Sequence, residues 1–246
     1  MQDQPGHAGS DTLSLSELVE LAHSRSPEDR RRLLEGVLTL CRTQPDICAS
    51  PVLGDIFMTL ARQAERDIRI TLSQALADAD WAPPALIHIL ALDDIEIARP
   101  VIAASPLLAD ADLLRILVEA TLEHQIEVAR RPRLSPVVAD AIIDQAEPAP
   151  LTALAGNTSA RLNDEAMRRL VEHSRRIAGL RSPLSRHPRL TEALAAQLYE
   201  WVGQALREAI NDRFKIEDAR LAPAIDRAVE QARGRSGPLF LEGTNR

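Results

Sequence analysis

An internal repeat of about 28 residues constrains the fold of this chain more than any other feature of its sequence. A leucine followed by a small or polar residue and then by a helical run recurs along the chain, and a tryptophan takes its place once. These anchors lie 26 to 28 residues apart: Leu53, Trp81, Leu108, Leu134, Leu162 and Leu190. Repeats of this length are typical of architectures in which each unit packs on the next.

The residues after each anchor follow one face of a helix. Four or five residues after the anchors stand Phe57, Leu86, Leu113, Val138, Met167 and Leu194, and eight residues after them stand Ala61, Ile89, Ile116, Ile142, Leu170 and Leu198. Apolar residues at such offsets indicate an amphipathic helix. Prolines 51, 106, 132 and 188 precede four of the anchors by two residues, and proline disfavours helix at the residue before it.

Each repeat is therefore predicted to be a short helix that ends near the proline, a turn that holds the anchor, and a second helix. Ser135, Asn163 and Thr191 follow their anchors directly and are good helix N-caps. One such unit cannot bury its own apolar face, but a stack of units can. Aromatic residues are only 2% of the chain, which also favours helix over strand. We expect an all-α fold, a right-handed α-solenoid of about six tandem helix pairs.

Atypical capping helices are expected at both ends of the repeats. The chain is divided as follows: 1–11 a disordered tail, 12–45 an N-terminal capping helix pair, 46–211 the repeats, 212–233 a C-terminal helix, and 234–246 a flexible tail. Within the capping pair, Ser26 and Pro27 predict a helix start. The helix that begins at Thr191 is predicted to run through Trp201 to about Ile210.

Several phrases resemble the units of HEAT-like or leucine-rich-variant helical repeats. They are VARRPRLSPVVADAI at 128–142, AASPLLADADLLRIL at 103–117 and SRHPRLTEALAAQL at 185–198. With the chain length, they resemble a bacterial family known as domain of unknown function 2336, over about residues 15–230. The pattern is weaker at Gly156 and Asn157. This resemblance implies a packing pattern and not a chemistry.

Motifs that would carry chemistry are missing from the sequence. It contains no GxxxxGK[ST] or GxGxxG phosphate loop, no HExxH, and no histidines paired at four residues. Cys41 and Cys48 are expected to serve core packing, and the carboxylates of Asp93, Asp94, Asp110 and Asp112 are expected to cap helix starts. His124 and His173 are predicted on solvated helix faces, with a phosphoacceptor role as the alternative. We therefore expect no cofactor, no metal and no enzymatic activity.

Arginines are concentrated toward the end of the repeats. Residues 161–189 hold eight arginines and three acids, whereas residues 85–125 hold seven acids and two arginines. Stacking would bring a second arginine cluster, one repeat earlier, beside the first. The predicted binding residues are Arg130, Arg131, Arg133, Arg161, Arg168, Arg169, Arg175, Arg176, Arg186 and Arg189. Guanidinium suits carboxylate and phosphate, so these residues either form an anion-binding surface or pair with neighbouring acids.

The expected function is a scaffold or signalling regulator that binds an acidic or phosphorylated protein or peptide. The net charge of −7, the single lysine and the few aromatics disfavour nucleic acid. The alternative is a nucleic-acid binder or DNA-repair enzyme on a HEAT-like scaffold. Apolar runs are too short to span a membrane and residues 1–11 lack a signal core, so a cytoplasmic location is expected. The oligomeric state is left open, with self-association through Leu198, Tyr199 and Trp201 as one possibility.

Overall fold

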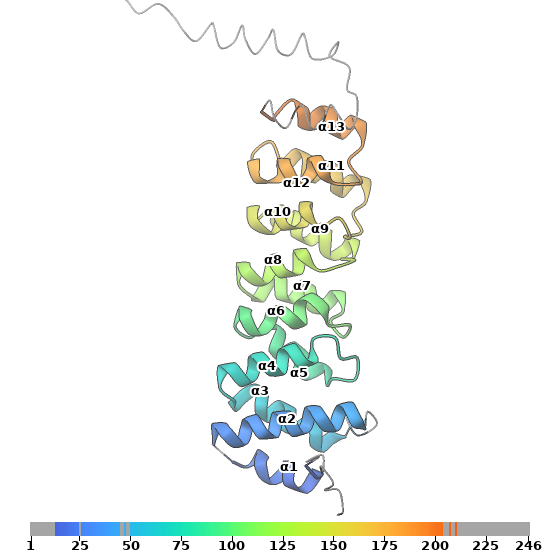
Figure 1. The fold of residues 1–246 in the computed structure, drawn as a ribbon. Coiled ribbons are helices and arrows are strands. Elements are labelled where there is room, and N and C mark those ends of the chain that lie inside the picture. The colour runs from blue at the N-terminus through green and yellow to red at the C-terminus, as the bar shows by residue number, and fades with distance from the viewer. Residues whose placement is uncertain are drawn as a thin grey trace, which may run out of the picture. The chain divides into compact units, whose positions relative to one another are not determined.

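The computed structural model describes residues 13–24, 26–44, 47, 50–203, 207 and 210. Every regular element in these ranges is a helix and none is a strand, which confirms the predicted all-helical class. The chain divides into an N-terminal unit, residues 1–166, and a C-terminal unit, residues 167–246. Helix α11 (Asp164–His173) spans the boundary between them. Figure 1 follows the helices in chain order from α1, in blue, to α13, in orange.

The N-terminal unit is built from short helices that pack in successive pairs. The helices are α1 (Leu15–Ala22), α2 (Pro27–Thr43), α3 (Pro51–Gln63), α4 (Arg66–Leu76), α5 (Pro84–Ala91), α6 (Ile95–Ala104), α7 (Asp110–Glu119), α8 (Leu122–Arg130), α9 (Pro136–Gln145) and α10 (Pro148–Gly156). Helix α3 contacts α4, α5 contacts α6, α7 contacts α8, and α9 contacts α10. In these four pairs, helices that are consecutive in the chain pack against each other.

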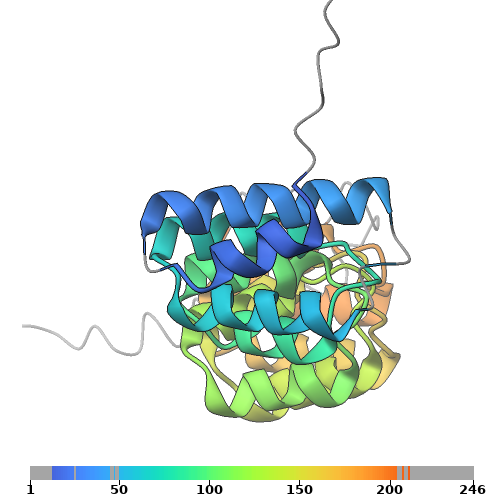
Figure 2. The same cartoon turned by 90° about the horizontal axis from the view of Figure 1, so that it is seen from below.

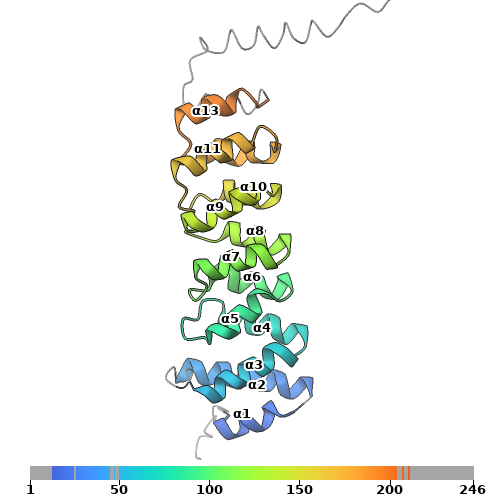
Figure 3. The ribbon, with the colours of Figure 1, turned by 180° about the vertical axis from the view of Figure 1, so that it is seen from behind.

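Successive pairs of the N-terminal unit are joined mainly through their second helices. Helix α4 contacts α6, α6 contacts α8, and α8 contacts α10, while α3 contacts α5 and α7 contacts α9 (Figure 3). The buried residues of α4, α6, α8 and α10 are mostly aliphatic, among them Leu72, Ile97, Val101, Val128 and Leu151. Burial of one such side chain contributes about 1.5–3 kcal/mol. The core is thus a row of small contacts that repeats from pair to pair.

Helices α1 and α2 begin the N-terminal unit. Ser14 and Glu17 form a capping box at α1, and Ser26 is the N-cap of α2, as the Ser26-Pro27 start predicts. The two helices contact each other closely, and Figure 2 looks onto them. A Cβ added at Gly36 would lie 2.7 Å from side-chain carbons of Leu13 and Leu18, so the glycine permits this approach.

Four of the six anchors occupy the predicted place. Leu108, Leu134, Leu162 and Leu190 are buried and lie in the turns that precede α7, α9, α11 and α13. The predicted N-caps are confirmed, because Ser135, Asn163 and Thr191 accept hydrogen bonds from the backbone N–H three residues on, at 3.3, 2.7 and 3.4 Å.

The first two anchors depart from the prediction. Leu53 lies inside α3, because Pro51 starts this helix instead of ending the previous one. Proline suits the first helical position, where its missing N–H would have no intrahelical partner. Trp81 lies in a longer turn, three residues before Pro84 starts α5, and its ring centroid is 6.2 Å from that of Phe57.

The described part of the C-terminal unit contains the end of α11, the 3-10 helix η2 (Ala178–Leu180), α12 (Arg181–Arg186) and α13 (Glu192–Tyr199). Helix α12 contacts η2 and α13. The predicted continuous helix from Thr191 to Ile210 is wrong, because α13 ends at Tyr199 and Gly203 is not helical. Glu200 and Trp201 already lie in a turn, and Gly203, a poor helix former, follows them.

The remaining sequence predictions concern the exposed patch at Leu198, the two cysteines, the C-terminal helix and the two tails. Leu198 is fully buried, so it belongs to the core and not to an exposed patch with Tyr199 and Trp201. Cys41 is buried, as predicted for a packing residue. Cys48, the C-terminal helix at 212–233 and both predicted tails, 1–11 and 234–246, lie outside the described residues.

Candidate functional site

The N-terminal unit brings two arginine-bearing turns together. One turn joins α8 to α9 and carries Arg133, and the other joins α10 to α11 and carries Arg161. The backbone N–H of Arg133 donates to Ser159 Oγ at 3.2 Å, and the backbone N–H of Arg161 donates to the carbonyl of Leu134 at 2.9 Å. The two turns that carry Arg133 and Arg161 are therefore joined through their backbones.

Asn157 fixes the same two turns. Its Nδ2 donates to the carbonyl of Ala129 at 2.9 Å and to that of Arg131 at 2.8 Å, and its Oδ1 accepts from Ser159 Oγ at 2.7 Å. Asn157, where the repeat pattern of the sequence is weakest, therefore joins two successive turns of the fold. Asn157 satisfies carbonyls at the end of α8 that have no intrahelical partner.

Arg133 and Arg161 are both exposed, and neither forms an ion pair with another described residue. Arg133 has a φ of 54°, in the left-handed region that glycine, asparagine and aspartate adopt most readily. An arginine there costs about 1–2 kcal/mol relative to an unstrained backbone. We call these two residues the Arg133–Arg161 pair.

The other predicted arginines of this unit have structural partners. Arg130 Nη1 lies 3.1 Å from Glu127 Oε1, which also contacts Arg99 Nε at 3.2 Å. Arg131 Nη1 donates to the carbonyl of Ile102 at 2.5 Å, and its Nη2 donates to that of Ser105. Burial lowers the pKa of Arg131, opposed by the nearby charge of Asp110. The Arg131 guanidinium therefore caps the C-terminal end of α6.

The predicted arginines of the C-terminal unit lie mostly on its surface. Arg168 Nη1 pairs with Glu172 Oε2 at 3.2 Å, and Arg169 is half-buried. Arg175, Arg176, Arg186 and Arg189 are exposed. The neighbouring Arg181 has a different role, because its Nε donates to the carbonyl of Ser174 at 2.9 Å. This unit has 15 basic and 10 acidic residues, a net charge of +5, against 14 and 26, a net of −12, in the N-terminal unit.

A second feature of the N-terminal unit is an acidic groove, which was not predicted. It has a volume of about 670 Å³ and lies where the turns before α6 and α8 meet the start of α4. Its charged or titratable lining residues are Arg66, Asp93, Asp94, Glu119, Glu123 and His124. We use the name acidic groove for this set.

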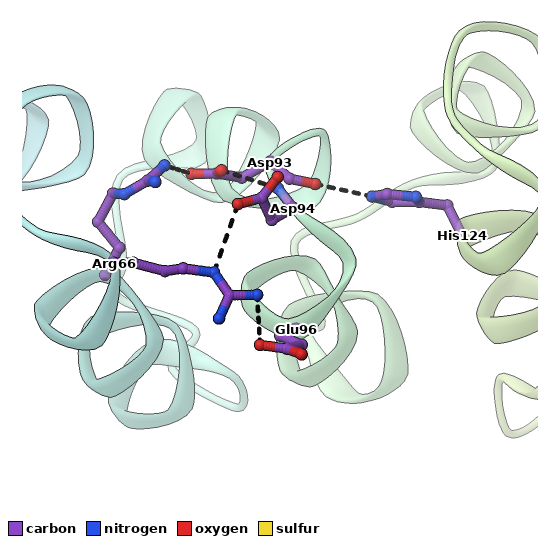
Figure 4. A network of polar contacts seen from close by, with 6 residues as sticks. Arg66, Asp93, Asp94, Glu96 and His124 are labelled. Atoms are coloured by element: carbon purple, nitrogen blue, oxygen red, sulfur yellow. Dashed lines mark hydrogen bonds and ion pairs between the residues drawn. The ribbon is translucent and has the colours of Figure 1, made fainter.

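Most charges in the acidic groove are paired within the fold (Figure 4). Arg66 Nε lies 3.5 Å from Asp94 Oδ2, and the same guanidinium pairs with Glu96. Asp93 pairs with Arg69. These pairs connect α4 to the start of α6, so their first role is to join two successive helix pairs.

His124 is buried, with 3% of its surface exposed, so the prediction of a solvated helix face is wrong. Its Nε2 lies 2.8 Å from the backbone carbonyl of Asp93 and its Nδ1 lies 2.8 Å from Thr121 Oγ1. A carbonyl can only accept, so Nε2 carries the proton and donates. Nε2 joins α8 to the turn before α6 and Nδ1 bonds to the N-cap of α8, so both ring nitrogens are engaged, which argues against a phosphoacceptor role.

The predicted acidic caps are present in part. Asp94 is the N-cap residue of α6, and Asp112 accepts a hydrogen bond from the backbone N–H of Ala109 at 2.9 Å. Asp112 Oδ1 also lies 3.1 Å from His88 Nε2. Among the described residues, no three His, Cys, Asp or Glu side chains are grouped so that they could hold a metal ion. None of the helices described here combines the length and apolarity needed to cross a membrane.

These observations define an all-helical protein whose described residues form short helices in two units. Residues 97–242, more than half of the chain, match the model of a family described as uncharacterised proteins conserved in bacteria, domain of unknown function 2336. The chain belongs to this family, as its sequence phrases predicted. No curated protein and no solved structure matches the chain.

Proposed function

We propose that this chain is a non-catalytic scaffold in the cytoplasm that binds an acidic or phosphorylated protein partner through its arginine-rich surface. We further propose that residues 46–211 form a right-handed α-solenoid of about six HEAT-like helix pairs. The contacts of α4 with α6, α6 with α8 and α8 with α10 support the stack. A repeated stack offers an extended surface and needs no catalytic centre.

The observation that carries the binding proposal is the exposure of the arginines. Arg175, Arg176 and Arg186 are exposed and form no ion pair with other described residues. They belong to a unit of net charge +5 in a chain of net charge −7. Guanidinium binds carboxylate and phosphate through paired hydrogen bonds, and an excess of one sign steers partners of the other sign.

The non-catalytic part of the proposal rests on how the polar side chains are used. The residues that most resemble a reactive cluster, Asp93, Asp94 and His124, are bonded to arginines, to a carbonyl or to a hydroxyl. The contacts with the arginines and with the carbonyl join one helix to another, and the hydroxyl of Thr121 belongs to the N-cap of the same helix as His124. Such an arrangement serves stability, because buried polar groups must be hydrogen-bonded.

Fluorescence anisotropy with a labelled hexaglutamate peptide tests the proposal. The double variant Arg175→Glu, Arg176→Glu is expected to weaken binding at least about tenfold, since it loses two charge-assisted contacts. Arg62→Glu is the matched control, because Arg62 is exposed on α3 and forms no ion pair with other described residues. Equal weakening by both variants would contradict a specific surface. Tighter binding of duplex DNA than of the peptide would contradict the partner class.

A further inference from the structure

We infer that the Arg133–Arg161 pair is a clamp for a phosphoryl group carried by a segment of a partner protein. This inference rests on the proposed function and specifies both the residues and the ligand chemistry. The two arginines come from turns one repeat apart in the N-terminal unit. They are distinct from the arginines of the C-terminal unit on which the proposed function chiefly depends.

The backbone beneath the clamp is firmly held. Both arginines donate their backbone N–H across the two turns, to Ser159 Oγ and to the carbonyl of Leu134. Asn157 adds two hydrogen bonds from one turn to the other. Binding therefore requires ordering of the two side chains only, which lowers the entropic cost of capturing a ligand.

The charge of the pair distinguishes it from most other arginines of the same unit. Seven of these pair with a carboxylate: Arg30, Arg31, Arg66, Arg69, Arg99, Arg115 and Arg130. Arg133 and Arg161 do not, although the unit carries 26 acids. The two arginines together carry a charge of +2, which matches the charge of nearly −2 on a phosphorylated side chain at neutral pH. A single carboxylate would neutralise only half of it.

The backbone at Arg133 also favours a binding role. Its left-handed φ of 54° would suit glycine, yet the sequence keeps a long cationic side chain there. Arginine occupies the same place, directly before the anchor leucine, at Arg133, Arg161 and Arg189, each 28 residues apart. Val52, Asp80 and Leu107 take this place in the earlier repeats. Arginine at this position is therefore a property of the later repeats and not a requirement of the turn.

Nuclear magnetic resonance of the full ¹⁵N-labelled chain tests the clamp. The probes are a Gly-Ser hexapeptide that carries one phosphoserine and its counterparts with glutamate or serine at that place. The Nε signals of Arg133 and Arg161 are expected to shift saturably with phosphoserine, and about tenfold more weakly with glutamate. Both Arg133→Gly and Arg161→Gln are expected to lower the phosphoserine affinity about tenfold.

A matched control separates binding from folding. Ala146 has a φ of 56°, and Ala146→Gly makes the same backbone change as Arg133→Gly without removing a charge. Both variants are expected to keep or raise the melting temperature, because glycine relieves the left-handed strain. Only Arg133→Gly is expected to lose affinity.

The outcomes distinguish the clamp from the proposed function. Shifts confined to arginines of the C-terminal unit would overturn the clamp and leave the proposed function standing. Equal affinity for the phosphoserine and glutamate peptides would overturn phosphoryl recognition in favour of a carboxylate ligand. No arginine shift with either peptide would contradict both the clamp and the proposed function.

Discussion

The two units of the chain use arginine in different ways. In the N-terminal unit, with 14 arginines and 26 acids, seven arginines pair with a carboxylate of a described residue. In the C-terminal unit, with 15 basic and 10 acidic residues, Arg175, Arg176 and Arg186 project from the surface. The residue type alone does not decide whether an arginine is paired, and neither does the number of acids, because Arg133 and Arg161 have no carboxylate partner among the described residues of the acidic unit.

The paired arginines of the N-terminal unit follow the order of its helices. Contacts run from α2 to the start of α4 through Arg30–Glu65 and Arg31–Asp67, from α4 to α6 through Arg66–Asp94, and from α6 to α8 through Arg99–Glu127. The exposed pairs among them, Arg31–Asp67 and Arg66–Asp94, contribute about 0–1 kcal/mol each. These ion pairs contribute more to the specificity of helix packing than to the free energy of unfolding.

The largest effects are expected at the anchors, and they test whether the two units are separate. Leu134→Ala and Leu190→Ala each remove a buried side chain, 2% and 3% exposed, and should each cost about 3 kcal/mol. Hydrogen exchange should localise the first loss to the N-terminal unit and the second to the C-terminal unit. Equal deprotection of both units by Leu190→Ala would show one cooperative structure and break the comparison.

A smaller effect is expected at Arg131, which contrasts a structural arginine with a surface one. Arg131→Ala leaves the carbonyls of Ile102 and Ser105 without their donor and should cost about 2 kcal/mol in urea unfolding. The neighbouring Arg130 is exposed, and Glu127 keeps Arg99 as a partner, so Arg130→Ala should cost under about 1 kcal/mol. The reverse order would mean that Arg131 does not close α6.

A still smaller effect is expected where α4 meets α6. Arg66 and Asp94 are both more than half exposed, so a double-mutant cycle with Arg66→Ala and Asp94→Ala should give a coupling free energy of about 0.5 kcal/mol. High salt should reduce the coupling, since exposed charges are screened. A coupling above about 2 kcal/mol would show that the acidic groove is a rigid site and not a set of surface pairs.

The smallest effect concerns the titration of Asp67. The hydrogen bond from Arg31 is the main cause that lowers the pKa of Asp67 below its ordinary value. A lowered pKa gives stability that is present above the ordinary aspartate range and is lost as pH falls through the folded-state pKa. Arg31→Ala should therefore raise the pKa of Asp67, followed by its carboxyl ¹³C signal. An unchanged pKa of Asp67 in this variant would show that Arg31 and Asp67 do not interact in solution.

Much of the fold could be predicted, because its determinants are local. The apolar residues that follow the anchors Leu108, Leu134, Leu162 and Leu190 recur at helical offsets. The caps at Ser135 and Thr191 depend only on the next three residues. The prediction that a helix ends near Pro51 is wrong, because a proline can also occupy the first position of a helix.

The site was less predictable, because its contacts join residues one repeat apart. The buried His124 donates a hydrogen bond to the backbone carbonyl of Asp93. The Arg131 guanidinium donates to a backbone carbonyl at the end of α6. A sequence shows side chains but not which backbone carbonyls lack a partner. The spacing of 28 residues from Arg66 to Asp94 and from Arg99 to Glu127 was a signal that could have revealed the ion pairs.

The central claim is that binding uses the arginines and not the acidic groove. The most direct test compares labelled hexaglutamate and hexaarginine peptides on the full chain, the Arg175→Glu, Arg176→Glu variant, and an Asp94→Asn, Glu123→Gln variant of the groove. We expect hexaglutamate to bind more tightly and to lose affinity only in the arginine variant. Tighter binding of hexaarginine, abolished by the groove variant, would contradict the account.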